Sequence, residues 1–209
     1  MAKTKKRKKK KRINLFPVLV ILLIIGGLVV CRYFDKIADK AKDFSPSKFT
    51  YPTKYEEYVI KYSKEFDIDA RFVYAIINTE SHFDPEATSD VGARGLMQLM
   101  EDAYDWVKFR LDDEREHTFD DMYDPELNIQ YGTYMLKYLY DRYDSYELAA
   151  AAYHGGMGAV DGWIEDGTVD PDNFDLDDVP SEVTANYIYK VTTAYDKYKE
   201  KLKEENENG

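Results

Sequence analysis

The sequence predicts an all-α, or nearly all-α, domain that is preceded by one transmembrane helix. Apolar residues between positions 53 and 203 recur with helical spacing, and the alternating pattern typical of strands is scarce there. A second observation is an apolar run of 19 residues near the N-terminus. We therefore divide the chain into a basic cytoplasmic segment (1–12), a membrane anchor (13–31), a stalk (32–52), a helical domain (53–203) and a flexible tail (204–209).

The membrane anchor is predicted from charge and length. Residues 3–12 contain nine Lys or Arg and no acidic residue, and residues 13–31 are apolar apart from Asn14. At a rise of about 1.5 Å per residue, this run nearly spans a bilayer core about 30 Å thick. Because basic flanks stay in the cytoplasm, we expect a single-pass protein of the cell membrane with its domain on the extracellular side. A cleaved signal peptide is the alternative, although the run is longer than usual for one.

The predicted extracellular part is strongly acidic. Residues 32–209 contain 20 Lys and Arg against 40 Asp and Glu, a formal net charge of −20. This charge excludes nucleic acid as a natural partner, because phosphate contacts depend on clustered Lys and Arg. The only cysteine, Cys31, lies at the membrane edge, so no disulfide can form within the chain and the stability of the domain must come from its core.

Three helices of the domain can be placed from their boundaries. One covers about residues 69–81, a second begins at Asp124 as N-cap with Pro125 in the first helical position, and a third begins at Ser181. The second has a face formed by Leu127, Tyr131, Tyr134, Met135, Tyr138, Leu139 and Arg142, and the third has one formed by Thr184, Tyr187, Ile188, Val191, Tyr195, Tyr198 and Leu202. Before them, turn-forming residues such as Pro46 and Pro52 indicate the stalk.

Glu80 is the candidate catalytic residue. It prolongs an apolar stripe of the helix over residues 69–81, made of Ile68, Phe72, Val73, Ile76 and Ile77. We expect its carboxyl group to lie in a cleft at the edge of the core, where burial and the negative end of the helix both oppose ionisation. A carboxylic acid that stays protonated near neutral pH is what cleavage of a glycosidic bond requires, because the leaving oxygen must be protonated as it departs. Taken alone, a glutamate at a helix end is more often a solvated surface group.

Three further sequence blocks accompany Glu80-Ser81-His82-Phe83. They are Gly92-Ala93-Arg94-Gly95-Leu96-Met97-Gln98, Ala151-Ala152-Tyr153-His154-Gly155-Gly156-Met157-Gly158 and Asn186-Tyr187-Ile188-Tyr189-Lys190-Val191. In order and separation the four blocks resemble the catalytic domain of the soluble lytic transglycosylases. These are enzymes of the lysozyme-like superfamily that cut the glycan strands of peptidoglycan. The resemblance covers about residues 55–198.

The glycines of the second block have two interpretations. Gly92 and Gly95 leave no side chain at an expected helix start, so the backbone can approach a sugar closely, and Gln98 adds an amide with both donors and an acceptor. Alternatively, the glycines permit tight helix packing, and the neighbouring Leu96 and Met97 belong to the core.

The resemblance implies a reaction and a set of site residues. In this family the glutamate of the first block is the single catalytic acid and base, a role that falls on Glu80. The glycan groove is then expected to be lined by Ser89, Gln98, Met100, Tyr153, His154 and Tyr187. The implied reaction cleaves the β-1,4 bond between N-acetylmuramic acid and N-acetylglucosamine. The 6-hydroxyl of the muramic acid residue itself attacks the anomeric carbon, which leaves a 1,6-anhydromuramoyl end. No metal and no cofactor is implied, and the expected partner is the peptidoglycan glycan strand on the cell-wall side of the membrane.

The chain departs from the family pattern at two positions of interest. His154 stands where the third block usually has asparagine, and a histidine becomes a double donor on protonation, so we expect an unusual dependence of activity on pH. Val183 stands where the family often has a glutamate four residues before Tyr187, with Glu182 beside it. This second change bears on how the substrate is positioned.

Two other functions stay open on the sequence alone. A goose-type muramidase would hydrolyse the same bond, which usually requires a second carboxylate. Asp84, Asp90 and Glu101 lie near Glu80 in the sequence, but none shares its helical face. A membrane-anchored, wall-binding scaffold that has lost catalysis is the second alternative, suggested by the two departures.

Metal chemistry is not indicated by the sequence. The three histidines lack the spacing of a zinc site, and the acidic run over residues 166–178 lacks the glycine and the oxygen spacing of an EF-hand. The sequence also points to no particular protein partner in the cell wall or in a secretion machinery.

Overall fold

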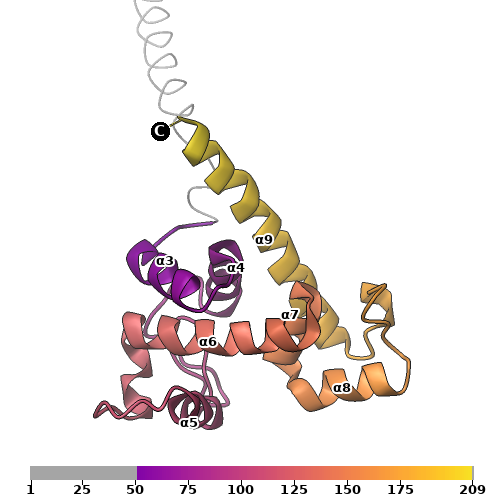
Figure 1. Ribbon diagram of the computed structural model, residues 1–209, viewed down its shortest axis with the longest axis horizontal. Helices are drawn as coiled ribbons and strands as arrows, with labels where there is room; N and C mark the ends of the chain where they lie inside the picture. The colour runs from indigo at the N-terminus through magenta and orange to yellow at the C-terminus, as the bar shows by residue number, and fades with distance from the viewer. Residues whose placement is uncertain (1–50, 209) are drawn as a thin grey trace, which may run out of the picture. The chain divides into compact units, whose positions relative to one another are not determined.

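The computed structural model describes residues 51–208 of the chain, with side chains to residue 203 (Figure 1). The predicted cytoplasmic segment, the membrane anchor and residues 32–50 of the stalk lie outside the described residues. Within residues 51–208, no helix combines the length and the apolar character that crossing a membrane requires.

The described residues form a helical domain. It contains the α-helices α3 (Glu56–Glu65), α4 (Ala70–Glu80), α5 (Glu101–Arg110), α6 (Pro125–Tyr143), α7 (Tyr146–Gly155), α8 (Met157–Glu165) and α9 (Glu182–Asn208), with two 3₁₀ helices, η1 (Phe119–Tyr123) and η2 (Leu176–Asp178). Strand pairing in this part of the chain is limited to isolated bridges that Arg94 makes with Thr88 and Leu99. The predicted all-α class is confirmed for residues 51–208.

The helix starts follow the predicted capping chemistry. The carboxylate of Asp124 accepts a hydrogen bond from the backbone N–H of Leu127 at 2.9 Å, and Pro125 occupies the first turn of α6. Ser181 Oγ accepts the backbone N–H of Thr184 at 3.2 Å at the start of α9. In both helices a polar side chain thus satisfies an N–H that has no partner within the helix.

Helix α7 occupies the interior of the domain and leads into the third sequence block. It packs against α6 and α9, and α9 packs in turn against α4 (Figure 1). Its central residues Leu148, Ala149, Ala150, Ala151 and Ala152 are all buried. Because alanine has only one side-chain carbon, helices can approach α7 closely on more than one side. The packed helix fixes the position of the residues that follow, Tyr153 and His154.

The buried surface of α6 is wider than the predicted face. Leu127, Tyr131 and Leu139 are buried as expected, but Arg142 is exposed and forms an ion pair with Asp161 at 2.7 Å. The expected face therefore continues into an exposed, charged end at Arg142. Since α6 contacts α3, α5 and α7, it buries additional residues that a single helical face omits, namely Asn128, Ile129, Gly132, Thr133 and Leu136.

Both predicted ends of the domain differ from the structure. Tyr51 and Pro52, assigned to the stalk, pack on α9: the ring of Tyr51 lies 5.6 Å from that of Tyr198, whose hydroxyl donates to the carbonyl of Pro52 at 2.8 Å. At the other end, α9 continues to Asn208, whereas we expected the domain to end at residue 203. The described domain thus begins no later than residue 51.

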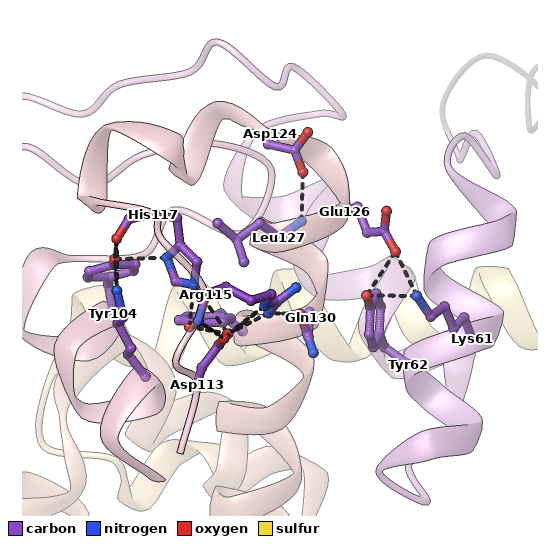
Figure 2. A network of polar contacts seen from close by, with 12 residues as sticks. Lys61, Tyr62, Tyr104, Asp113, Arg115, His117, Asp124, Glu126, Leu127 and Gln130 are labelled. Carbon is purple, nitrogen blue, oxygen red and sulfur yellow. Dashed lines mark hydrogen bonds and ion pairs between the residues drawn. The ribbon is translucent and has the colours of Figure 1, made fainter. Parts of the chain in front are cut away.

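A partly buried polar network holds the connection between α5 and α6 (Figure 2). The carboxylate of Asp113 accepts hydrogen bonds from Arg115 at 2.5 Å and from the hydroxyl of Tyr131 at 2.8 Å, and it lies 3.2 Å from Nε2 of His117. Tyr104 contacts the other ring nitrogen of His117 at 2.9 Å. The hydrogen bonds from Arg115, and then from Tyr131 and His117, hold the pKa of Asp113 well below its usual range.

Candidate active site

Glu80 is the last residue of α4 and is partly buried. Its Oε1 accepts a hydrogen bond from the hydroxyl of Tyr187 on α9 at 2.6 Å. Burial raises the pKa of Glu80 to about 7, and the hydrogen bond from Tyr187 acts in the opposite direction by favouring the anion. The pKa therefore lies at neutrality, where one carboxyl group can both give and take a proton.

The chain turns sharply after Glu80. Ser81 ends the helix, and its hydroxyl donates to the carbonyl of Leu96 at 2.7 Å, which links α4 to the second sequence block. His82 and Phe83 follow with φ angles of 52° and 65°, in the left-handed region that residues other than glycine seldom occupy. Burial of the Phe83 ring, which is 2% exposed, accompanies this conformation. The turn therefore ends α4 directly at Glu80.

The second block forms a loop stabilised by its own polar groups. Ser89 Oγ accepts the backbone N–H of Ala93 at 2.9 Å. Gln98 donates its side-chain amide to the carbonyls of Ala87 at 3.0 Å and Gly95 at 2.8 Å. The donors that we expected Gln98 to offer to a sugar are thus engaged within the loop. The carbonyl oxygen of its side chain is the acceptor that these two bonds leave available.

The two glycines of this loop differ in their surroundings. Both have positive φ, 89° for Gly92 and 74° for Gly95. A side chain at Gly95 would collide with the carbonyl of Met122 and with Asn128, whereas a side chain at Gly92 would meet nothing within 4 Å. Gly95 therefore serves tight packing, as the alternative interpretation held. The expected helix start at this block is wrong, since α5 begins only at Glu101.

Asn128 supports the same loop and was not identified from the sequence. This fully buried residue of α6 accepts the backbone N–H of Met97 at 2.8 Å and donates to the carbonyls of Arg94 at 3.0 Å and Met122 at 2.8 Å. Two of these hydrogen bonds fix the loop against α6, and the third ties η1 to the same amide. The available signal was a polar residue between two apolar ones, Leu127 and Ile129, in a helix of the core.

Tyr153 and His154 bring the third block to Glu80 and Tyr187. The hydroxyl of Tyr153 donates to the carbonyl of Met97 at 2.7 Å. Burial, and then the charge of Glu80, raise the pKa of Tyr153 well above its usual value, so this hydroxyl stays protonated. The ring of His154 stacks on that of Tyr187, with 4.6 Å between centroids and 28° between planes.

The predicted site residues therefore fall into two groups. Glu80, Tyr153, His154 and Tyr187 come together from α4, α7 and α9. A second group consists of Ser89 and Gln98 in the loop and Met100, which precedes α5 and is 43% exposed. Among the hydrogen bonds of the described residues, none joins this second group to Glu80.

Comparison with known proteins places the chain in a family. Residues 57–173 match the family described as Transglycosylase SLT domain. The chain belongs to this family. This SLT-domain protein is 35% identical over 167 residues to the soluble lytic murein transglycosylase of Salmonella typhimurium, covering 78% of the chain and 25% of that protein. It is also 34% identical over 116 residues to the membrane-bound lytic murein transglycosylase C of Sodalis glossinidius, covering 51% of the chain and 32% of that protein.

Solved structures agree with this family assignment. The 70 kDa soluble lytic transglycosylase of Escherichia coli superposes with a TM-score of 0.68 at 26% identity, covering 73% of the chain and 25% of that protein. The SLT-domain chain thus spans about a quarter of the length of these soluble relatives. Its relatives include both soluble and membrane-bound lytic murein transglycosylases.

Proposed function

We propose that this SLT-domain protein is a peptidoglycan lytic transglycosylase in which Glu80 acts first as the acid and then as the base. The observation that carries the proposal is the state of Glu80, a partly buried carboxyl group with a pKa of about 7 that accepts a hydrogen bond from Tyr187. The family membership and the names of the relatives supply the substrate, the murein glycan strand.

The proposed reaction consumes no water. Protonated Glu80 gives its proton to the glycosidic oxygen, and the bond from that oxygen to C1 of N-acetylmuramic acid breaks. The 6-hydroxyl of the same sugar then forms the bond to C1 and passes its proton to the Glu80 carboxylate. The 1,6-anhydro ring closes and the acid is restored. A pKa of about 7 suits both transfers, because neither protonation state of Glu80 is scarce near neutral pH.

The surroundings of Glu80 favour this route over hydrolysis. Burial and the Tyr187 hydrogen bond account for its pKa shift, and no carboxylate of the described residues contributes to it. Hydrolysis usually requires a second carboxylate about 5 to 10 Å from the first. The lytic route requires only Glu80, because its nucleophile belongs to the substrate. Tyr153, Ser89, Gln98 and Met100 are proposed to line the groove that holds the glycan.

Analysis of reaction products tests this proposal. Purified full-length chain is incubated with peptidoglycan, and the released muropeptides are separated and weighed by mass spectrometry. Anhydromuramoyl ends, lighter than reducing ends by one water, are expected as the main product. Products with reducing ends would assign the chain to the muramidases, and intact peptidoglycan would assign it to a wall-binding role.

We further propose that residues 13–31 anchor the protein in the cell membrane with the SLT domain on the cell-wall side. The apolar run, its nine preceding basic residues and the membrane-bound relatives support this arrangement. The full chain should sediment with membranes and lose its domain, but not its N-terminal segment, to protease added from outside. A soluble extracellular form that begins near Arg32 as the dominant product would contradict the anchor.

A further inference from the structure

His154 lies in the last turn of α7 and contacts the first turns of α9. Its ring covers one face of the Tyr187 ring, with 4.6 Å between centroids, and its Nδ1 lies 3.4 Å from Oγ1 of Thr184. Thr184 is three residues before Tyr187 on α9 and is tied to Ser181 by a hydrogen bond of 3.0 Å. Two residues of α9 therefore contact the exposed imidazole, Tyr187 through its ring and Thr184 through its hydroxyl.

Tyr187 contacts both His154 and the carboxyl group of Glu80. Its ring is 7% exposed and its hydroxyl donates to Glu80 at 2.6 Å. The hydroxyl lies at the end of a rigid ring, so any rotation or shift of the ring moves the donor relative to the carboxylate. Because hydrogen bonds weaken steeply with distance and angle, the packing of the ring determines the strength of this bond. The imidazole of His154 forms one side of that packing.

His154 contributes to this site without adding a charge at neutral pH. His154 is exposed, and desolvation of the part of its ring that packs on neighbouring side chains lowers its pKa. The groups that face Glu80 are likewise neutral: Tyr187 from α9, and Tyr153 from α7, whose pKa the charge of Glu80 raises. The stacked imidazole thus supports Tyr187 while leaving Glu80 free of a neighbouring cation.

We propose that His154 is a positioning residue that acts on Glu80 through Tyr187: its stacked ring holds the Tyr187 hydroxyl on the carboxyl group. This inference rests on the proposed function of Glu80 and changes the role expected for His154, which we predicted to contact the glycan. The geometry points instead to a contact with the tyrosine.

The variants that test it are His154→Asn, which removes the aromatic ring, and His154→Phe, which keeps a stacking ring. Each is made in the full chain and in a Tyr187→Phe background. His154→Asn should lower kcat about 3- to 10-fold and change KM by less than about twofold, since an aromatic contact of this kind has a modest energy and acts after binding. His154→Phe should restore most of kcat. In the Tyr187→Phe background, His154→Asn should cause little further loss.

The pKa of Glu80 supplies a readout that a substrate contact would not move. Losing the Tyr187 hydrogen bond removes a contribution that favours the anion, so the pKa of Glu80 should rise in His154→Asn, as we also expect for Tyr187→Phe. It is measured by NMR titration of ¹³C-glutamate-labelled full chain, with Glu80→Gln to assign the resonance. This measurement needs no turnover, so it tests His154 even if peptidoglycan is not cleaved.

Three outcomes would overturn the inference. The first is that His154→Asn leaves both kcat and the pKa of Glu80 unchanged. The second is that it raises KM at constant kcat. The third is that the losses of kcat from His154→Asn and Tyr187→Phe add fully in the double variant. If His154→Asn does not fold by circular dichroism, His154→Leu replaces it as the variant without an aromatic ring, under the same criteria. Failure of the parent chain to form anhydromuramoyl ends, with the Glu80 pKa still responding to His154, would refute the proposed function alone.

Discussion

The hydroxyl of Tyr187 lies 2.6 Å from Oε1 of Glu80, across 107 residues of sequence. The bond joins the C-terminal end of α4 to the second turn of α9, and it works against burial in setting the pKa of Glu80. Burial favours the protonated acid and Tyr187 favours the anion. The pKa of about 7 is the balance of these two effects.

Replacing Tyr187 by phenylalanine should raise the pKa of Glu80. Without the donated hydrogen bond, the pKa of Glu80 should rise above about 7, and the basic limb of the kcat/KM profile should move to higher pH. We expect kcat to fall about tenfold, because the carboxyl group also loses its orientation. Tyr189→Phe is the matched control, since Tyr189 lies two residues further on α9 and is 60% exposed. Equal pH profiles for the two variants would refute the role given to Tyr187.

Glu80 should also make stability depend on pH. Its pKa is raised from 4.5 to about 7 in the folded protein, so the folded state binds this proton more tightly than the unfolded chain. The stabilisation by this proton is complete below pH 4.5 and is lost as the pH rises through 7. Glu80→Gln removes this dependence of stability on pH. At pH 8 its free energy of unfolding should be higher than that of the parent chain by up to about 3 kcal/mol, and at pH 4 the two should be similar.

Urea unfolding at the two pH values measures this effect. Glu165→Gln is the control, because Glu165 likewise ends a helix, α8, but is exposed. A stability difference between Glu80→Gln and the parent chain that is the same at pH 4 and pH 8 would contradict the raised pKa.

Replacement of each loop glycine by alanine should lower the free energy of unfolding, and by different amounts at the two positions. Gly92→Ala and Gly95→Ala both place a side chain at positive φ, which costs about 1 to 2 kcal/mol. Gly95→Ala must in addition displace the carbonyl of Met122 and the amide of Asn128, so we expect a total of about 3 kcal/mol or more. Chemical denaturation of both variants checks this, and equal losses would show that the loop can adjust around Gly95.

The Asp113 network predicts a loss of stability that depends on pH. Asp113→Asn removes a charge that accepts hydrogen bonds from Arg115 and Tyr131, and it should cost about 2 kcal/mol at pH 7. Because the pKa of Asp113 is lowered by folding, the contribution is complete above the unfolded value of 3.8 and declines as the pH falls below it. The cost at pH 3 should thus be smaller than at pH 7. Asp112→Asn, at an exposed neighbour, should cost little at either pH.

Local patterns in the sequence predicted the parts of the fold that depend on local chemistry. The caps at Asp124 and Ser181, the helix that ends at Glu80 and the burial of its apolar stripe are all confirmed. Helical periodicity identified only part of the buried surface of α6, because a helix with neighbours on several sides buries more than one face. The contact between His154 and Tyr187 could not be derived from spacing, since it depends on how α7 meets α9.

The site, like the fold, could be predicted only in part from the sequence. Glu80 was predicted from its stripe and its block, but the donors of Gln98 are used within its own loop, and Asn128 supports that loop from a distant helix. Sequence blocks identify which residues belong to a site. They do not distinguish a residue that contacts the ligand from one that supports its neighbouring residues.

The most direct test of the account compares Glu80→Gln with the parent chain on peptidoglycan. Glutamine nearly preserves the shape of the side chain but cannot transfer a proton, so the variant should fold and sediment with peptidoglycan like the parent. Loss of a general acid or base typically lowers the rate about 10²- to 10⁴-fold, and one residue that serves both steps belongs at the upper end. Mass spectrometry should therefore detect anhydromuramoyl products from the parent chain and almost none from Glu80→Gln. Product release by Glu80→Gln within a few-fold of the parent would contradict the mechanism.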